Sequence, residues 1–118
     1  MSSSENLILD ITAISQELRI RPEIYCKILK NFTSSLEGKM RNLSQAILIN
    51  NLDQARMILH EIKGTAGDLR LKNLLGPEES LHTAVKADEN AARLHQYYQD
   101  LKREVERLEQ SVEKLNIG

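Results

Sequence analysis

Apolar residues recur at intervals of three and four along most of the chain, the spacing that places them on one face of an α-helix. This pattern predicts a short helix over Asn6–Leu18, a long helix from Pro22 to about Asn50, a third over about Asp53–Leu69, and a short one over Glu78–Lys86. Pro22 suits the first turn of its helix, where a backbone N–H is not needed. No segment shows the strict alternation that predicts a strand.

The last segment has the most regular pattern, because its apolar residues alternate spacings of four and three over three repeats. These residues are Leu94, Tyr98, Leu101, Val105, Leu108, Val112 and Leu115. Such a seam suits a coiled-coil homodimer, which is one interpretation of this helix. The other predicted helices also carry apolar stripes that need partners, so packing within one chain is the simpler interpretation.

Short polar or helix-breaking segments separate these helices. Turns are predicted at Asn50-Asn51 and at Ala87–Asn90. A break between two helices is expected at Gly76-Pro77, and the third helix is expected to be capped by Asp53. Short connections make consecutive helices run in opposite directions. The predicted fold is therefore all-α, an antiparallel up-down-up-down four-helix bundle with a short extra N-terminal helix.

Composition narrows the class of protein. The chain has 118 residues, which suits a single domain over residues 1–118, with residues 1–5 expected to be disordered. Its formal net charge of −1 and its few aromatic residues argue against nucleic-acid binding. A lone cysteine, Cys26, excludes an intramolecular disulfide and favours a reducing compartment. No apolar run is long enough to span a membrane, so we expect a cytoplasmic protein without membrane contact.

The third predicted helix displays an unusual group of residues on its outer face. With Ile62 at the centre of the apolar face, His60 lies about 160° away at 100° per residue. The same outer side holds Asp53, Arg56, Met57, Lys63, Gly64 and Gly67. Each glycine costs a helix about 0.8–1 kcal/mol relative to alanine. We therefore expect the glycines to clear space around the histidine.

The residue pattern excludes several kinds of catalytic site. His60 and Glu61 do not form the HExxH zinc motif, because the residue at i+4 is Gly64. The remaining histidines, His82 and His95, are scattered and do not give metal-ligand spacing. The chain also lacks a glycine-rich phosphate loop, so it is not expected to bind ATP as a kinase does.

What remains is an exposed imidazole with cations beside it. A neutral imidazole is a nucleophile near neutral pH and can carry a phosphoryl group. Lys63 at i+3 and Arg56 at i−4 are placed to orient that group, and Gly64 leaves room for a partner's active site. Taken singly, His60 and Lys63 are ordinary surface residues, and the glycines suit a kink or a tight helix crossing. Their grouping on one outer face favours the functional interpretation.

The segment HEIKGTAGDL resembles the signature of histidine-containing phosphotransfer (HPt) domains of bacterial multistep phosphorelays. The matching residues are His60, Ile62, Lys63, Gly64, Thr65, Ala66 and Leu69. The order and length of the predicted helices are also similar to the family over nearly the whole chain. The resemblance implies a four-helix bundle that carries phosphate on His60, with Lys63 placing the phosphoryl group and Gly64 giving access.

The resemblance also implies the partners. Receiver domains of hybrid sensor kinases and response regulators would exchange the phosphoryl group with His60. They would supply the acceptor aspartate and Mg²⁺, so that the chain needs no cofactor of its own and is a carrier rather than an enzyme. A phosphorylation-independent helical adaptor with an HPt-like fold is the alternative.

The chain departs from the family at one position, because Arg70 stands where many members have a glycine. Arg70 is expected to influence which receivers dock, or to contact phosphate. The predicted docking rim around His60 consists of Arg56, Met57, Gly67, Arg70 and Leu71. A transient interface of this kind suits a protein that is itself a monomer.

Overall fold

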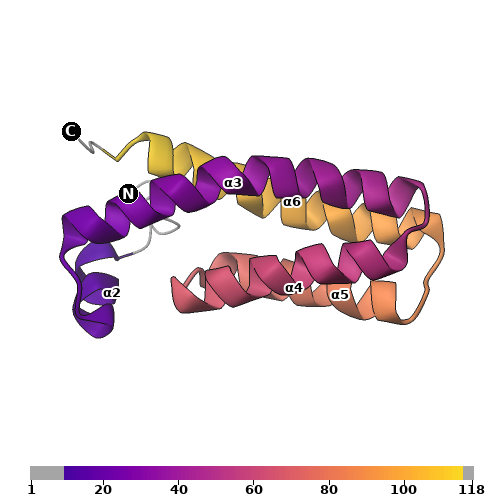
Figure 1. Cartoon of the computed structure of the whole chain (residues 1–118), viewed down its shortest axis with the longest axis horizontal. Helices are drawn as coiled ribbons and strands as arrows, with labels where there is room; N and C mark the ends of the chain where they lie inside the picture. Colours follow the sequence, from indigo (N-terminus) through magenta and orange to yellow (C-terminus); the bar gives the residue numbers. More distant parts are fainter. Residues whose placement is uncertain (1–9, 116–118) are drawn as a thin grey trace.

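The structure is a computed structural model that describes residues 10–115, and within this range it contains helices and no strand. The all-α class is therefore confirmed for this part of the chain. The expected disorder of residues 1–5, and the start of the first helix at Asn6, lie outside the described residues. Figure 1 shows the five helices, which are α2 (Ile11–Leu18), α3 (Pro22–Leu48), α4 (Leu52–Asp68), α5 (Lys72–Lys86) and α6 (Ala91–Glu113).

The four longer helices lie lengthwise beside one another (Figure 1). Each of them packs against two others, so that α3 contacts α4, α4 contacts α5, α5 contacts α6, and α6 contacts α3. The short α2 packs against α3. None of the helices within residues 10–115 is long and apolar enough to cross a membrane.

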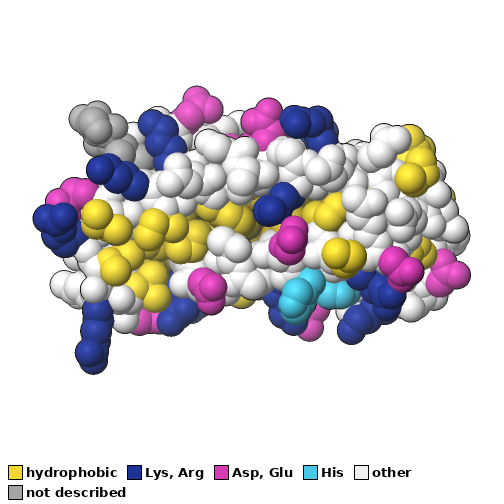
Figure 2. Space-filling view, in the orientation of Figure 1, with side chains coloured by type: hydrophobic (Ala, Val, Ile, Leu, Met, Phe, Trp, Pro, Cys, Tyr) yellow, Lys and Arg dark blue, Asp and Glu magenta, His cyan; other side chains and the backbone are white. Residues whose placement is uncertain are grey.

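Part of the apolar surface of α3 remains exposed. Ile28 is 38% exposed, and Ile24 is 36% exposed. Apolar side chains form a band over α3 and towards α2 on the face that Figure 2 shows. The buried apolar residues of α3 include Tyr25, Leu29, Phe32, Leu36, Met40 and Leu43, whereas Ile47 is only partly buried.

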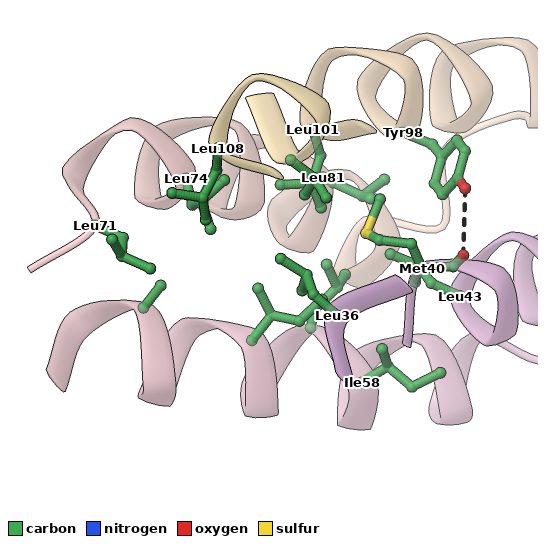
Figure 3. Close-up of a cluster of buried hydrophobic side chains, with 14 of the residues drawn as sticks. Leu36, Met40, Leu43, Ile58, Leu71, Leu74, Leu81, Tyr98, Leu101 and Leu108 are labelled. Carbon is green, nitrogen blue, oxygen red and sulfur yellow. Dashed lines mark hydrogen bonds between the residues drawn. The ribbon is translucent and has the colours of Figure 1, made fainter. Parts of the chain in front are cut away.

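The seam of α6 is buried inside the chain. Leu94, Leu101 and Val105 are at most 3% exposed, and only Leu115 at the end of the seam is partly buried. Figure 3 shows side chains of α6 meeting those of the other helices, and the Tyr98 hydroxyl donates to the carbonyl of Met40 at 3.2 Å. Because this seam already packs on its own chain, it is not free for a coiled-coil partner.

The predicted break at Gly76-Pro77 is wrong. Helix α5 begins at Lys72 and continues through Pro77 to Lys86. Leu74 and Leu81, on either side of the proline, are 1% and 0% exposed. Pro77 lies in the second turn, where its missing N–H removes one backbone bond, and the burial of these leucines outweighs that local loss.

The cap of α4 also differs from the prediction. Asn51, rather than Asp53, is the N-cap residue, and its side-chain oxygen accepts from the backbone N–H of Gln54 at 3.2 Å. Asp53 lies in the first turn, where its carboxylate is favoured by the helix dipole and pairs with Arg56. The turn that precedes the cap is as predicted, with Asn50 in the left-handed region at a φ of 59°.

Candidate phosphoryl-carrying face of helix α4

Helix α4 has a closed inner face and an open outer face. Leu59, Ile62 and Ala66 on the inner face are all 0% exposed and pack into the core. His60 and Lys63 lie on the exposed side, as the spacing predicts. The apolar stripe therefore fixes the rotation of the helix and holds the imidazole outwards.

Gly64 and Gly67 face open space. A Cβ atom added at either position would have no neighbouring atom within 4 Å. The helix also runs through both residues without interruption. Neither a tight helix crossing nor a break in the helix thus explains these glycines, and the clearance around His60 is a physical feature of the surface.

The charged residues near His60 differ in their partners. Arg56 forms an ion pair with Asp53 on its own helix, and Glu61 accepts from Lys39 of α3 at 3.5 Å. Within residues 10–115, no carboxylate lies within 4 Å of the Lys63 ammonium. Residues at i and i+3 are neighbours on a helix surface, so Lys63 offers an uncommitted positive charge beside His60.

The predicted docking rim is only partly exposed. Met57 is 68% exposed and Gly67 is half-buried. Leu71 is 2% exposed, and its inclusion in the rim is therefore wrong. It is the residue directly before α5, where its side chain closes the end of the core rather than facing solvent (Figure 3).

Arg70 has a structural role at the end of α4. Its φ of 62° lies in the left-handed region that favours glycine. Its guanidinium donates to the carbonyls of Gly67 and Asp68, at 3.1 and 3.3 Å, and pairs with Glu17 of α2. It also lies ten residues beyond His60, about 15 Å along the helix axis at 1.5 Å per residue. This placement argues against a contact between Arg70 and a phosphoryl group on His60.

Two polar residues of α5 were missed by the sequence analysis. Glu78 is 1% exposed, and one of its carboxylate oxygens lies 3.1 Å from Nδ1 of His82. Burial raises the pKa of the Glu78 carboxyl, while His82 and Lys63 oppose that rise. Their i, i+4 spacing on one helix could have indicated that the two side chains pair. The predicted break at Gly76-Pro77 instead made Glu78 the first residue of a helix, where a glutamate is ordinarily exposed.

Two surface pockets lie between α3 and α6, and neither is lined by a residue of α4. Within residues 10–115, no three His, Cys, Asp or Glu side chains are close enough together to hold a metal ion. A reaction at His60 would therefore take place on the exposed face of α4, which a second protein can cover.

Comparison of the chain with models of known protein families, with curated protein sequences and with solved structures gave no significant match.

Proposed function

We propose that this chain is a histidine phosphotransfer protein that carries a phosphoryl group on His60 between receiver domains. The observation that carries the proposal is the grouping on α4 of an outward imidazole, an unpaired lysine and two glycines that face open space. This grouping supplies a nucleophile, a charge for the phosphoryl group and access for a partner.

The transfer step follows from the chemistry of imidazole. The lone pair of an unprotonated ring nitrogen attacks the phosphorus of an aspartyl phosphate, and the other ring nitrogen keeps its hydrogen. A nitrogen–phosphorus bond forms, the bond from phosphorus to the aspartate oxygen breaks, and the aspartate leaves as a carboxylate. Reversal of the step on another receiver returns the phosphoryl group to an aspartate.

The chain's own contribution is positioning and charge. Lys63 offsets the negative charge that the phosphoryl group brings to the surface of α4. The acceptor aspartate and Mg²⁺ belong to the receiver, so the chain acts as a carrier and needs no ATP site. The open space over Gly64 lets the receiver's active site approach the imidazole.

The arrangement of the helices fits this proposal. The connections at 49–51, 69–71 and 87–90 are short, and each joins two helices that pack together. We infer that α3 to α6 form an antiparallel up-down-up-down bundle in which α4 presents His60. This arrangement, with the HEIKGTAGDL segment, is what the resemblance to HPt domains implies.

The proposal is tested by phosphoryl transfer from a phosphorylated receiver domain. We expect label that is labile to acid and stable to base on the unaltered chain, and none on His60→Gln. His95→Gln removes another exposed histidine, on α6, and serves as the matched control with unchanged labelling. Equal labelling of His60→Gln and the unaltered chain would show that His60 is not the acceptor.

The same experiment separates the carrier from a phosphorylation-independent adaptor. An adaptor would bind receivers equally well before and after phosphorylation, and its binding would survive His60→Gln. A carrier would accept label. A coiled-coil homodimer, the other interpretation of the α6 seam, would sediment as a dimer. Because this seam is buried within the chain, we expect a monomer in sedimentation at micromolar concentration.

A further inference from the structure

Glu78 is a buried acid with an incomplete set of hydrogen bonds. Its side chain is 1% exposed, and one carboxylate oxygen is bonded to Nδ1 of His82 at 3.1 Å. The other oxygen, Oε1, has no hydrogen-bond partner within residues 10–115. A buried carboxylate with a free oxygen is costly unless nearby positive charge compensates it or it takes up a proton.

The position of this pair places it beside the His60 site. Helices α4 and α5 pack together and are joined by residues 69–71 alone, so they run in opposite directions. One turn forward on α5, from Glu78 to His82, therefore corresponds to about one turn back on α4, from Lys63 towards His60. The charge of Lys63 does act on the carboxyl of Glu78.

Figure 2 shows histidine side chains next to lysine and arginine side chains on the face formed by α4 and α5. His82 is only partly buried, with 16% of its side chain exposed, so its ring reaches the surface from the Glu78 side. The pair therefore connects the buried carboxylate to the face that carries His60 and Lys63.

We propose that Glu78 and His82 form a proton-linked pair that regulates the His60 site through the positive charge around Lys63. This inference rests on the phosphotransfer function proposed above and adds a regulation to it. Positive charge beside His60 favours the phosphoryl group, which approaches two negative charges. The number of protons held by the pair would then set how readily His60 is phosphorylated.

The charges of the pair can be counted. With both groups protonated, the pair carries +1 through the imidazolium of His82. Release of one proton leaves the pair neutral, and release of the second leaves −1 on Glu78, which reduces the positive field of Lys63. The other charge that acts on Glu78 is Glu79 on the same helix, and the described part of α6 contributes none that shifts its pKa. At a pH at which Glu78 is ionised, phosphoryl acceptance should therefore be lower than in a chain whose residue 78 carries no charge.

The first arm of the test measures the carboxyl group directly. The side-chain carbon resonance of Glu78, followed by NMR against pH, should titrate above the ordinary glutamate value of 4.5. Since His82 and Lys63 both lower the pKa of Glu78, His82→Gln and Lys63→Met should each move its titration to still higher pH. Glu79→Gln, the matched control, should move it slightly in the opposite direction.

The second arm measures acceptance of phosphoryl groups from a receiver at pH values on either side of the titration of Glu78 found in the first arm. Glu78→Gln keeps the size of the side chain but can never carry −1. It should match the unaltered chain where Glu78 is protonated and exceed it by about fivefold where Glu78 is ionised, the effect of about one charge at a partly exposed site. Glu79→Gln should follow the unaltered chain throughout.

The two arms fail in different ways. The regulatory role of the pair would be overturned if Glu78 titrated at the ordinary glutamate value, or if Lys63→Met left its titration unchanged. This conclusion would hold whether or not the chain accepts phosphoryl groups. The titration of Glu78 could shift in His82→Gln and Lys63→Met while Glu78→Gln accepts phosphoryl groups as the unaltered chain does. That result would make the pair a structural contact and would also overturn the proposed regulation. Coupling with no acceptance at any pH would overturn the proposed function and with it the regulation of transfer.

Discussion

The outer faces of α4 and α6 are built differently, although both helices bury a regular apolar inner face. On α6 the exposed arginines are committed to acids nearby in sequence. Arg93 pairs with Glu89 at 3.3 Å, Arg103 with Asp100 at 3.4 Å, and Arg107 with Glu104 at 3.2 Å. On α4, Arg56 is paired in the same way, whereas Lys63, beside His60, has no such partner within the residues that the structure describes. Lys102 of α6 has none either, but it has no histidine or glycine next to it on its helix.

This difference is too small to matter for stability, because an exposed ion pair contributes at most about 1 kcal/mol. Under the proposed function, the importance of this difference is chemical. A charge that is already paired is a poor ligand for an incoming phosphoryl group, whereas Lys63 is available to one. The two glycines of α4 also carry a helix cost of about 0.8–1 kcal/mol each. The outer face of α4 gives up stability for access, and that of α6 does not.

The largest expected effect comes from the inner face of α6. Leu101 is 0% exposed, and its truncation to alanine should lower the free energy of unfolding by about 2–5 kcal/mol. Chemical denaturation measures this loss. If α6 serves the fold alone, the transfer rate per folded molecule should not change, and Lys102→Ala on the exposed side should leave both quantities nearly unaltered.

The next effect concerns access over α4. Gly64→Gln adds a long side chain beside His60, and it should slow transfer by about tenfold, a change of about 1.4 kcal/mol in the barrier. The helix should be no less stable, since the new Cβ meets no atom within 4 Å and glutamine is the better helix former.

Gly38→Gln is the matched control for this substitution. Gly38 lies inside α3, where an added Cβ would meet only the end of the Arg41 side chain, at 3.8 Å. Its replacement should give a similar change in circular dichroism without the loss of transfer rate. A normal transfer rate in Gly64→Gln would show that the open space over Gly64 is not needed for access to His60.

The sequence was sufficient to predict α4 because a regular apolar stripe determines which residues face outwards. Ile62 and Ala66 are buried at the centre of that stripe, so the exposure of His60 follows from spacing alone. The same reasoning predicted the buried seam of α6. Periodicity works where many core contacts agree with one another.

Local signals failed where packing outweighed them. Gly76-Pro77 reads as a break, but the buried leucines on either side hold the helix together. That error displaced the start of α5 and hid the burial of Glu78, which no propensity predicts for a glutamate. Leu71, which was predicted to lie on the docking rim, is also buried, directly before the first residue of α5.

Arg70 shows a third kind of limit. The sequence revealed that it stands where a glycine is expected, but not why. The structure gives a physical reason, since residue 70 adopts a positive φ and its side chain donates to two carbonyls at the end of α4. A contact of this kind depends on the position of Glu17 in another helix, which the pattern of one helix cannot specify.

The smallest expected effect is the sharpest test of the comparison between the two outer faces. Arg103→Ala removes a paired charge from α6 and should change the free energy of unfolding by less than about 0.5 kcal/mol. Lys63→Ala removes an unpaired charge from α4 and should change stability as little, while slowing transfer by about fivefold. Denaturation curves and transfer rates measured on both variants decide the matter. If Arg103→Ala slowed transfer as much as Lys63→Ala did, net charge rather than the placement of Lys63 would govern the reaction.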